Sequence, residues 1–267
     1  MTIALIGSGR SADQIAERLR AAGHSLIVFD PAHEPTGAVE EVLRSAGRLF
    51  LAFTRSQEAQ DWLAQPAVVS LLAGRHLVDA SRHAPQEARG IARQVTTAGA
   101  RYLEIALLET SSSDRVIAAG REEDYHSEMS LLAALGQAEY LGPVGQVATV
   151  RLALAQISAA MTGALAMSLG LVAREGVDSD RFLALMAATP THALQFDRQA
   201  SRMRAGRYGA ESGPSVDDVL LDLRAFTRAA VRHHLDTHQL VGLQHIVELA
   251  QELGYAEDDP TALHATL

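Results

Sequence analysis

Residues 147–176 read VATVRLALAQISAAMTGALAMSLGLVAREG, and this stretch divides the chain into two different halves. The segment is rich in Ala, Leu and Met, which favour helices, and it carries no charge between Arg151 and Arg174. Short β-like runs alternate with helical runs before it, whereas only helical runs follow it. We therefore predict one long helix that joins an α/β half to an all-helical half.

The uncharged run over residues 152–173 is long enough to cross a bilayer. It is only weakly apolar, however, because it contains Gln156, Ser158, Thr162 and Ser168, and it stands alone in the sequence. We therefore predict a buried interdomain helix and no membrane partner.

The composition is that of a globular protein with a substantial core, since 48% of the 267 residues are hydrophobic and 21% are charged. The absence of cysteine excludes disulfides, thiolate metal sites and a cysteine nucleophile, so a cytoplasmic location is the simplest expectation. A net charge of −9 argues against nucleic acid as a partner. The absence of lysine excludes Schiff-base chemistry, and arginine is a poor proton shuttle.

The first thirty residues predict a dinucleotide-binding unit. A strand over residues 2–6 is followed by a glycine turn, a helix to about residue 22 and a strand over residues 25–29. Gly7 permits the tight turn, Gly9 lets the backbone approach a pyrophosphate, and Ala12 allows close packing of helix against strand. The helix N-terminus offers N–H groups to phosphates. The cofactor-binding candidates are Gly7, Gly9, Arg10, Ser11, Ala12, Asp30, Thr54 and Ser81.

Asp30 ends the second strand at the spacing where a carboxylate accepts hydrogen bonds from ribose hydroxyls. Pro31 and Ala32 follow it, where a 2′-phosphate would favour arginine. This pattern favours NAD(H), and NADP(H) remains open because His33 or Arg10 could reach a phosphate. The alternative is a tight turn in a fold that has lost its cofactor.

The remainder of the first half alternates strands and helices, which predicts a parallel, doubly wound sheet in a Rossmann domain. In such sheets ligands lie beyond the carboxyl ends of the strands. We therefore expect one crevice there, surrounded by residues 7–12, Asp30, Thr54, Ser81 and the loop over residues 108–113. The further strands are predicted at residues 48–53, 76–80, 101–107, 115–119 and 139–141.

The second half predicts helices at residues 179–188, 192–205, 216–234 and 238–253. Such a half cannot easily bury its apolar faces alone, so we expect a homodimer. The predicted division is a dinucleotide-binding domain over residues 1–146, the interdomain helix over 147–176, and a helical domain for dimerisation and substrate over 177–267.

Several segments together identify a familiar pattern: residues 3–30 (IALIGSGRSADQIAERLRAAGHSLIVFD), 76–104 (HLVDASRHAPQEARGIARQVTTAGARYLE), 141–156 (LGPVGQVATVRLALAQ), 168–186 (SLGLVAREGVDSDRFLALM), 218–226 (DVLLDLRAF) and 247–263 (VELAQELGYAEDDPTAL). Over nearly its whole length the chain resembles the β-hydroxyacid dehydrogenase superfamily and, within it, the imine reductases. The resemblance implies a Rossmann domain, an interdomain helix, a helical domain interlocked with a dimer mate, and hydride transfer with NAD(P)H.

Arg151 stands where the resemblance places the catalytic lysine of hydroxyacid dehydrogenases, and where imine reductases often have Asp or Tyr. Ala155 stands at the position of their asparagine. We interpret Arg151 as a group that holds a substrate carboxylate or polarises a carbonyl. The alternative is that it pairs with Glu104 or Glu109 and only holds the domains together.

Ser81, Glu109 and Asp222 are the other catalytic candidates. Ser81 could bind substrate or the nicotinamide carboxamide, or instead cap the helix that follows it. Glu109, in a loop expected to face substrate, could protonate an imine nitrogen, or the loop could simply be solvated. Asp222 could donate a proton, or pair with Arg224 or Arg228.

The predicted function is that of an NAD(P)H-dependent oxidoreductase that transfers hydride to a C=N or C=O carbon of a small substrate. Imine reduction is favoured, because an iminium already carries its activating charge and needs no lysine. The alternative is a non-redox or cofactor-binding regulatory homologue on the same scaffold. No metal site is predicted, because His234 and His238 have no third ligand at a matching spacing.

Overall fold

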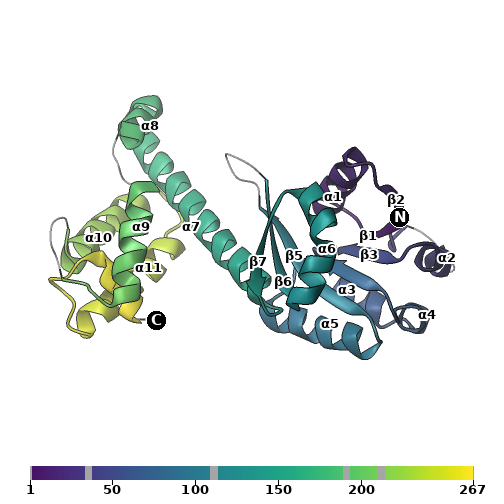
Figure 1. Ribbon diagram of the computed structural model, residues 1–267. Coiled ribbons are helices and arrows are strands. Elements are labelled where there is room, and N and C mark those ends of the chain that lie inside the picture. The colour runs from purple at the N-terminus through teal and green to yellow at the C-terminus, as the bar shows by residue number, and fades with distance from the viewer. Residues whose placement is uncertain (1, 34–37, 109–113, 189–192, 210–213, 267) are drawn as a thin grey trace. The chain divides into compact units, whose positions relative to one another are not determined.

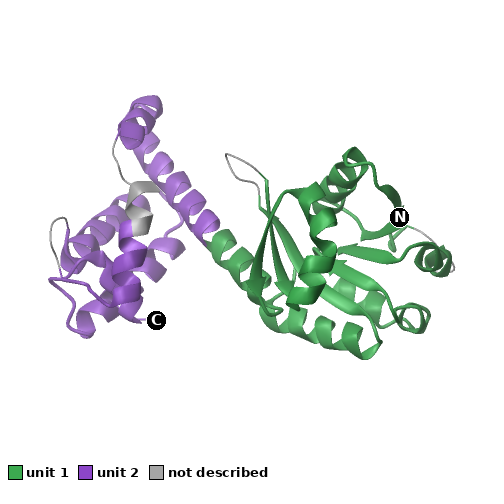
Figure 2. Cartoon of the chain, viewed as in Figure 1, with its two compact units in different colours: residues 1–156 green, residues 157–267 purple. Residues whose placement is uncertain are grey.

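The structure is a computed structural model that describes residues 2–33, 38–108, 114–188, 193–209 and 214–266. It divides into two compact units, Met1–Gln156 and Ile157–Leu267 (Figure 2). The boundary between these units falls inside the long helix. The division into three parts at residues 146 and 176 therefore remains a prediction.

Unit 1 is built on a seven-stranded sheet in the order β2-β1-β3-β4-β5-β6-β7 (Figure 1). The first five strands of this order are mutually parallel, and β6 and β7 are also parallel to each other. The doubly wound α/β prediction is confirmed. The strands are β1 Thr2–Gly7, β2 Ser25–Phe29, β3 Arg48–Ala52, β4 His76–Asp79, β5 Arg101–Leu108, β6 Arg115–Gly120 and β7 Gln137–Gly142.

One strand pair departs from the parallel pattern. β5 and β6 are antiparallel, with Leu103 opposite Gly120 and Leu108 opposite Arg115. The connection between these strands is too short to hold the helix that a parallel crossover needs. The sequence already contained this information, because no helical run separates the two strands.

Helices cover both faces of the sheet. α1 (Arg10–Ala21) and α6 (Glu122–Leu135) pack on one face, while α2 (Ala38–Ser45), α3 (Ser56–Leu63), α4 (Pro66–Ser70) and α5 (Pro85–Thr97) form a core with the other. Side chains alternate between the faces along each strand, so Ile3 and Leu5 join the first core and Ala4 and Ile6 the second. Burial on both faces explains why β1 is apolar throughout.

The long helix α7 spans Gln146–Arg174, as predicted, but it is not buried in the single chain. Val147 and Ala148 are the buried residues of this helix, whereas Leu154 is 47% exposed and Met161 46% exposed. The prediction of a buried helix is therefore wrong for one chain, because an apolar sequence does not specify what covers it. By length and mean hydropathy (1.6) α7 could also cross a membrane, which for one such helix is weak support.

Unit 2 is helical, as predicted. Beyond its share of α7 it contains α8 Ser179–Ala188, α9 Ala193–Ala205, α10 Val216–Arg232, α11 His238–Glu252 and a short 3₁₀ helix, Pro260–Thr266, which the sequence did not predict. Val216 and Leu220 of α10 pack with Val247 and Ala250 of α11 and with Ala262. In the part of the chain that is described, this is the core that holds unit 2 together.

Candidate functional site

The turn between β1 and α1 has the geometry that a phosphate site needs. Gly7 and Gly9 have φ angles of +127° and +87°, which favour glycine. A Cβ on Gly7 would lie 2.4 Å from the carbonyl oxygen of Ala52. α1 begins at Arg10, and its N-cap Gly9 provides no side-chain cap. Helix geometry gives the first N–H groups of α1 no acceptor within the helix, which suits an anion at this position.

Asp30 lies beside this turn as an ionised carboxylate. It accepts hydrogen bonds from the Ala32 N–H at 3.0 Å and pairs with Nδ1 of His33 at 2.8 Å. Burial raises the pKa of Asp30, but the bonds from His33, Ala32 and Ser8 outweigh burial and hold the pKa below its usual value. A charged acceptor at this position suits ribose hydroxyls and opposes a 2′-phosphate.

Thr54 and Ser81 follow neighbouring parallel strands. Thr54 flanks the glycine turn, because a Cβ on Gly9 would lie 3.4 Å from its Oγ1. Ser81 is 6% exposed, and its Oγ accepts the Phe53 N–H at 2.9 Å. It does not cap α5, whose N-cap is Ala84, so the capping alternative is wrong. Its predicted contact with substrate remains a prediction.

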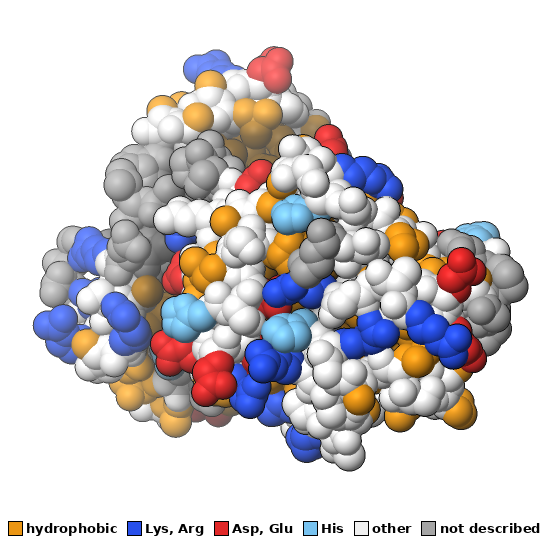
Figure 3. Space-filling model, turned by 45° about the vertical axis from the view of Figure 1, so that its right-hand side comes forward, with side chains coloured by type: hydrophobic (Ala, Val, Ile, Leu, Met, Phe, Trp, Pro, Cys, Tyr) orange, Lys and Arg blue, Asp and Glu red, His pale blue; other side chains and the backbone are white. Residues whose placement is uncertain are grey.

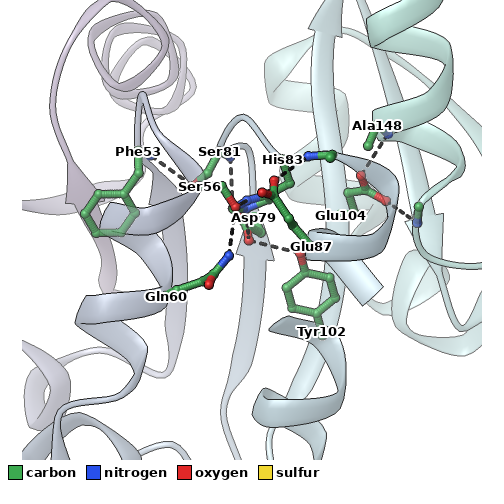
Figure 4. A network of polar contacts seen from close by, with 12 residues as sticks. Phe53, Ser56, Gln60, Asp79, Ser81, His83, Glu87, Tyr102, Glu104 and Ala148 are labelled. Carbon is green, nitrogen blue, oxygen red and sulfur yellow. Dashed lines mark hydrogen bonds and ion pairs between the residues drawn. The ribbon is translucent and has the colours of Figure 1, made fainter. Parts of the chain in front are cut away.

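A buried polar network that the sequence reasoning missed lies behind Ser81 (Figure 4). His83 Nε2 is 3.0 Å from Asp79 Oδ2, and His83 Nδ1 is 2.9 Å from Ser56 Oγ. Tyr102 donates its hydroxyl to the same Asp79 oxygen at 2.9 Å. Burial lowers the pKa of His83, but Asp79 outweighs burial and raises it. An acid that ends a buried strand, with a histidine four residues later, was the available signal.

Glu104 and Arg151 fix the start of α7 to β5 and to the segment that follows β4. Glu104, 3% exposed, accepts the N–H groups of Gly145 and Ala148 at 2.7 and 2.8 Å. Arg151 donates from Nη2 to the carbonyl oxygen of His83 at 2.7 Å (Figure 4 shows the Glu104 contacts). The predicted pairing of Arg151 with Glu104 is wrong, because Arg151 bonds the His83 carbonyl oxygen and Glu104 bonds the N–H groups of Gly145 and Ala148.

Two of the predicted catalytic residues lie outside the described part of unit 1. Glu109 lies outside the described residues, as does the rest of the loop over residues 109–113. Asp222 is exposed on α10 of unit 2, and Arg224 pairs with Glu248 at 2.8 Å instead of with Asp222. Their predicted roles therefore remain predictions.

A cleft of about 570 Å³ lies at this end of unit 1. Its walls combine cationic and polar side chains with leucines: Arg10, Ser11, Gln14, Arg82, Leu107, Leu108 and Leu154. This volume suits a small molecule. Arg82, which the sequence reasoning missed, is close enough to Arg151 for its charge to lower the Arg151 pKa, an effect second to burial.

Other surfaces of the described residues show weaker signs of a binding site. A second cleft of about 530 Å³ between α3 and α5 contains none of the predicted site residues. Among the described residues, no group of three or more His, Asp or Glu side chains could hold a metal ion. On the face in Figure 3, acidic and basic side chains are interspersed, which does not suit a nucleic-acid backbone.

No protein-family model matches the chain, and no curated protein matches it. Solved structures match over almost its whole length. A reductive aminase from Aspergillus terreus in complex with NADPH and ethyl levulinate has a TM-score of 0.84 and 22% identity, covering 98% of this chain and 97% of that one. An imine reductase from Myxococcus stipitatus in complex with NADP⁺ has a TM-score of 0.89 and 17% identity, covering 100% and 99%.

A third match is an imine reductase from Bacillus cereus, with a TM-score of 0.83 and 17% identity over 98% of this chain and 97% of that one. Sequence identities this low establish the fold alone. The chain therefore has the fold shared by imine reductases and reductive aminases, as its resemblance predicted.

Proposed function

We propose that this chain is an NAD(P)H-dependent oxidoreductase that transfers hydride to a C=N or C=O carbon of a small substrate. One observation carries the proposal: the uncapped N-terminus of α1 behind Gly7 and Gly9, with ionised Asp30 beside it. These groups fit the pyrophosphate and ribose of a dinucleotide. The bound cofactor would supply the hydride. The similar structures in complex with NADPH and NADP⁺ support the same class of cofactor.

Arg151 orients or polarises the substrate in this proposal. Its contact with the His83 carbonyl fixes the guanidinium and engages Nη2, while a guanidinium has five N–H donors in all. Burial and the charge of Arg82 lower the pKa of Arg151, yet arginine remains charged at physiological pH. The proton must therefore come from another group, for which Ser81, Glu109, Asp222 and ordered water are the candidates.

The cleft favours a substrate that carries an anionic group beside its C=N or C=O bond. Arg10 and Arg82 both line the cleft, and a cationic iminium alone would be repelled by them. The leucines of the same cleft suit an apolar body. Imine reduction is favoured over hydroxyacid oxidation because it requires no lysine base.

The proposed cofactor is NAD(H), since ionised Asp30 accepts from hydroxyls and repels a phosphate. NADP(H) remains the second possibility, because both NADPH and NADP⁺ occur in the similar structures.

We also propose that the enzyme is a cytoplasmic homodimer. Large apolar side chains are exposed along α7 and on unit 2, among them Leu154, Met161, Leu185 and Leu221. A second copy of the chain would remove this surface from water. Light scattering that finds only monomers at micromolar concentration would contradict the dimer.

The alternative is a cofactor-binding regulator without redox activity. The contact of Arg151 with the His83 carbonyl favours this alternative, because such a contact gives Arg151 a structural role.

The test is to titrate the purified chain with NADH and NADPH, and then to follow cofactor oxidation over cyclic imines and keto acids with and without a carboxylate. Saturable binding with turnover supports the proposal. Binding without turnover on any of these substrates favours the regulator, and no binding of either cofactor contradicts both.

A further inference from the structure

The start of α3 carries an ion pair beside the proposed dinucleotide site. Arg55 donates from Nε and Nη2 to Glu58 Oε1 at 2.8 and 2.5 Å, and Glu58 Oε2 accepts the Arg55 N–H at 3.1 Å. The preceding residue, Thr54, flanks Gly9 of the glycine turn. The Arg55 guanidinium is thus held by Glu58 of α3, and Arg55 directly follows the residue that flanks the glycine turn.

Glu58 also lies within the electrostatic field of Asp30. Hydrogen bonds from Arg55 hold the pKa of Glu58 below its usual value, while the charge of Asp30 acts in the opposite direction. Asp30 and Glu58 are therefore both ionised and close enough to interact, and Glu58 neutralises the charge of Arg55. The carboxylate of Asp30 repels a phosphate monoester, which carries a charge of about −1.5 to −2.

We propose that Glu58 is a determinant of cofactor choice. By binding Arg55 it withholds a guanidinium from the 2′-phosphate of NADPH, while Asp30 repels that phosphate. NADH has a 2′-hydroxyl at this position and gains nothing from a released arginine. This inference rests on the proposed dinucleotide site, and it assigns Arg55 and Glu58 to the specificity of that site.

The test is a Glu58→Gln variant measured by equilibrium titration with NADH or NADPH alone, without substrate. Glutamine keeps the side-chain length and an acceptor for the Arg55 N–H, but it removes the charge that binds the guanidinium. The dissociation constant for NADPH is expected to fall about fivefold, the size of an exposed ion pair, while that for NADH stays within about twofold.

Arg55→Gln separates release of the arginine from simple loss of a negative charge. Alone it should change the dissociation constant for NADPH little, and combined with Glu58→Gln it should abolish the fivefold gain. The matched control is Glu139→Gln, which removes the same charge from an exposed pair with Arg115 at the other edge of the sheet. It should leave both dissociation constants unchanged.

The proposal is overturned if Glu58→Gln, shown to be folded by its thermal unfolding curve, leaves the ratio of the two dissociation constants unchanged. It is also overturned if the double variant keeps the gain or if Glu139→Gln gives the same gain. A failure of the proposed function looks different, because the unmodified chain would then bind neither cofactor.

Discussion

The N-termini of α1 and α7 both belong to unit 1, but their N–H groups differ in whether a side chain caps them. α1 begins behind a glycine turn without a side-chain cap, whereas Glu104 occupies the N–H groups of Gly145 and Ala148 at the start of α7. An unsatisfied helix N-terminus attracts an external anion, and a capped one does not. The comparison indicates that α1 is a binding element and that the start of α7 is a structural one.

Removing the cap of α7 should have the largest effect. Glu104→Ala leaves two buried N–H groups without an acceptor, so the free energy of unfolding should fall by about 2–3 kcal/mol. Cofactor affinity should change little, because the phosphate site is at α1. Urea unfolding and a cofactor titration measure the two quantities. A variant with unchanged stability would show that Glu104 is not the cap described.

Arg151→Gln tests whether the start of α7 is only structural. We expect kcat/KM to fall about tenfold, as for the loss of one charged substrate contact, and the free energy of unfolding to fall by less than about 1 kcal/mol. Steady-state kinetics on a carboxylate-bearing imine and on its neutral analogue should show the larger loss for the former. Full activity on both would remove Arg151 from the mechanism and leave α7 purely structural.

The smallest expected effect is on the pH dependence of stability, and it comes from the buried pair of Asp79 and His83. Because Asp79 raises the pKa of His83 in the folded chain, their pair stabilises the fold fully below about pH 6.5. This contribution is lost as the pH rises through the folded pKa of His83. His83→Gln should flatten that dependence. The control His126→Gln, an exposed histidine, should retain it, and an equal slope in both variants would contradict the assignment.

The start of α1 and the start of α7 also differ in how well the sequence predicts their contacts. The glycine turn and Asp30 depend on local spacing and on φ angles that only glycine adopts readily, so they were predicted residue by residue. The contacts of Arg151 and Ser81 join residues far apart in the chain, His83 and Phe53 respectively, through backbone atoms. No residue pattern specifies which carbonyl or N–H group a distant side chain meets.

The fold shows the same division between local and distant information. Strand and helix positions followed from periodicity, and the antiparallel β6 could have been inferred from the missing helix before it. The exposure of α7 could not, because its apolar sequence is equally compatible with burial by unit 2, by a second chain or by lipid. Composition predicts that such a helix needs a partner without identifying the partner.

The most direct test of the central claim compares Gly9→Ala with Gly23→Ala in NADH binding. Both glycines have positive φ, +87° and +84°. A Cβ on Gly9 would lie 3.4 Å from Thr54 Oγ1 in the proposed phosphate site, whereas a Cβ on Gly23 would meet no atom within 4 Å. Both variants should lose similar stability, about 1 kcal/mol. Gly9→Ala alone should weaken NADH binding at least about tenfold. Equal NADH affinity in the two variants would contradict a dinucleotide site at the start of α1.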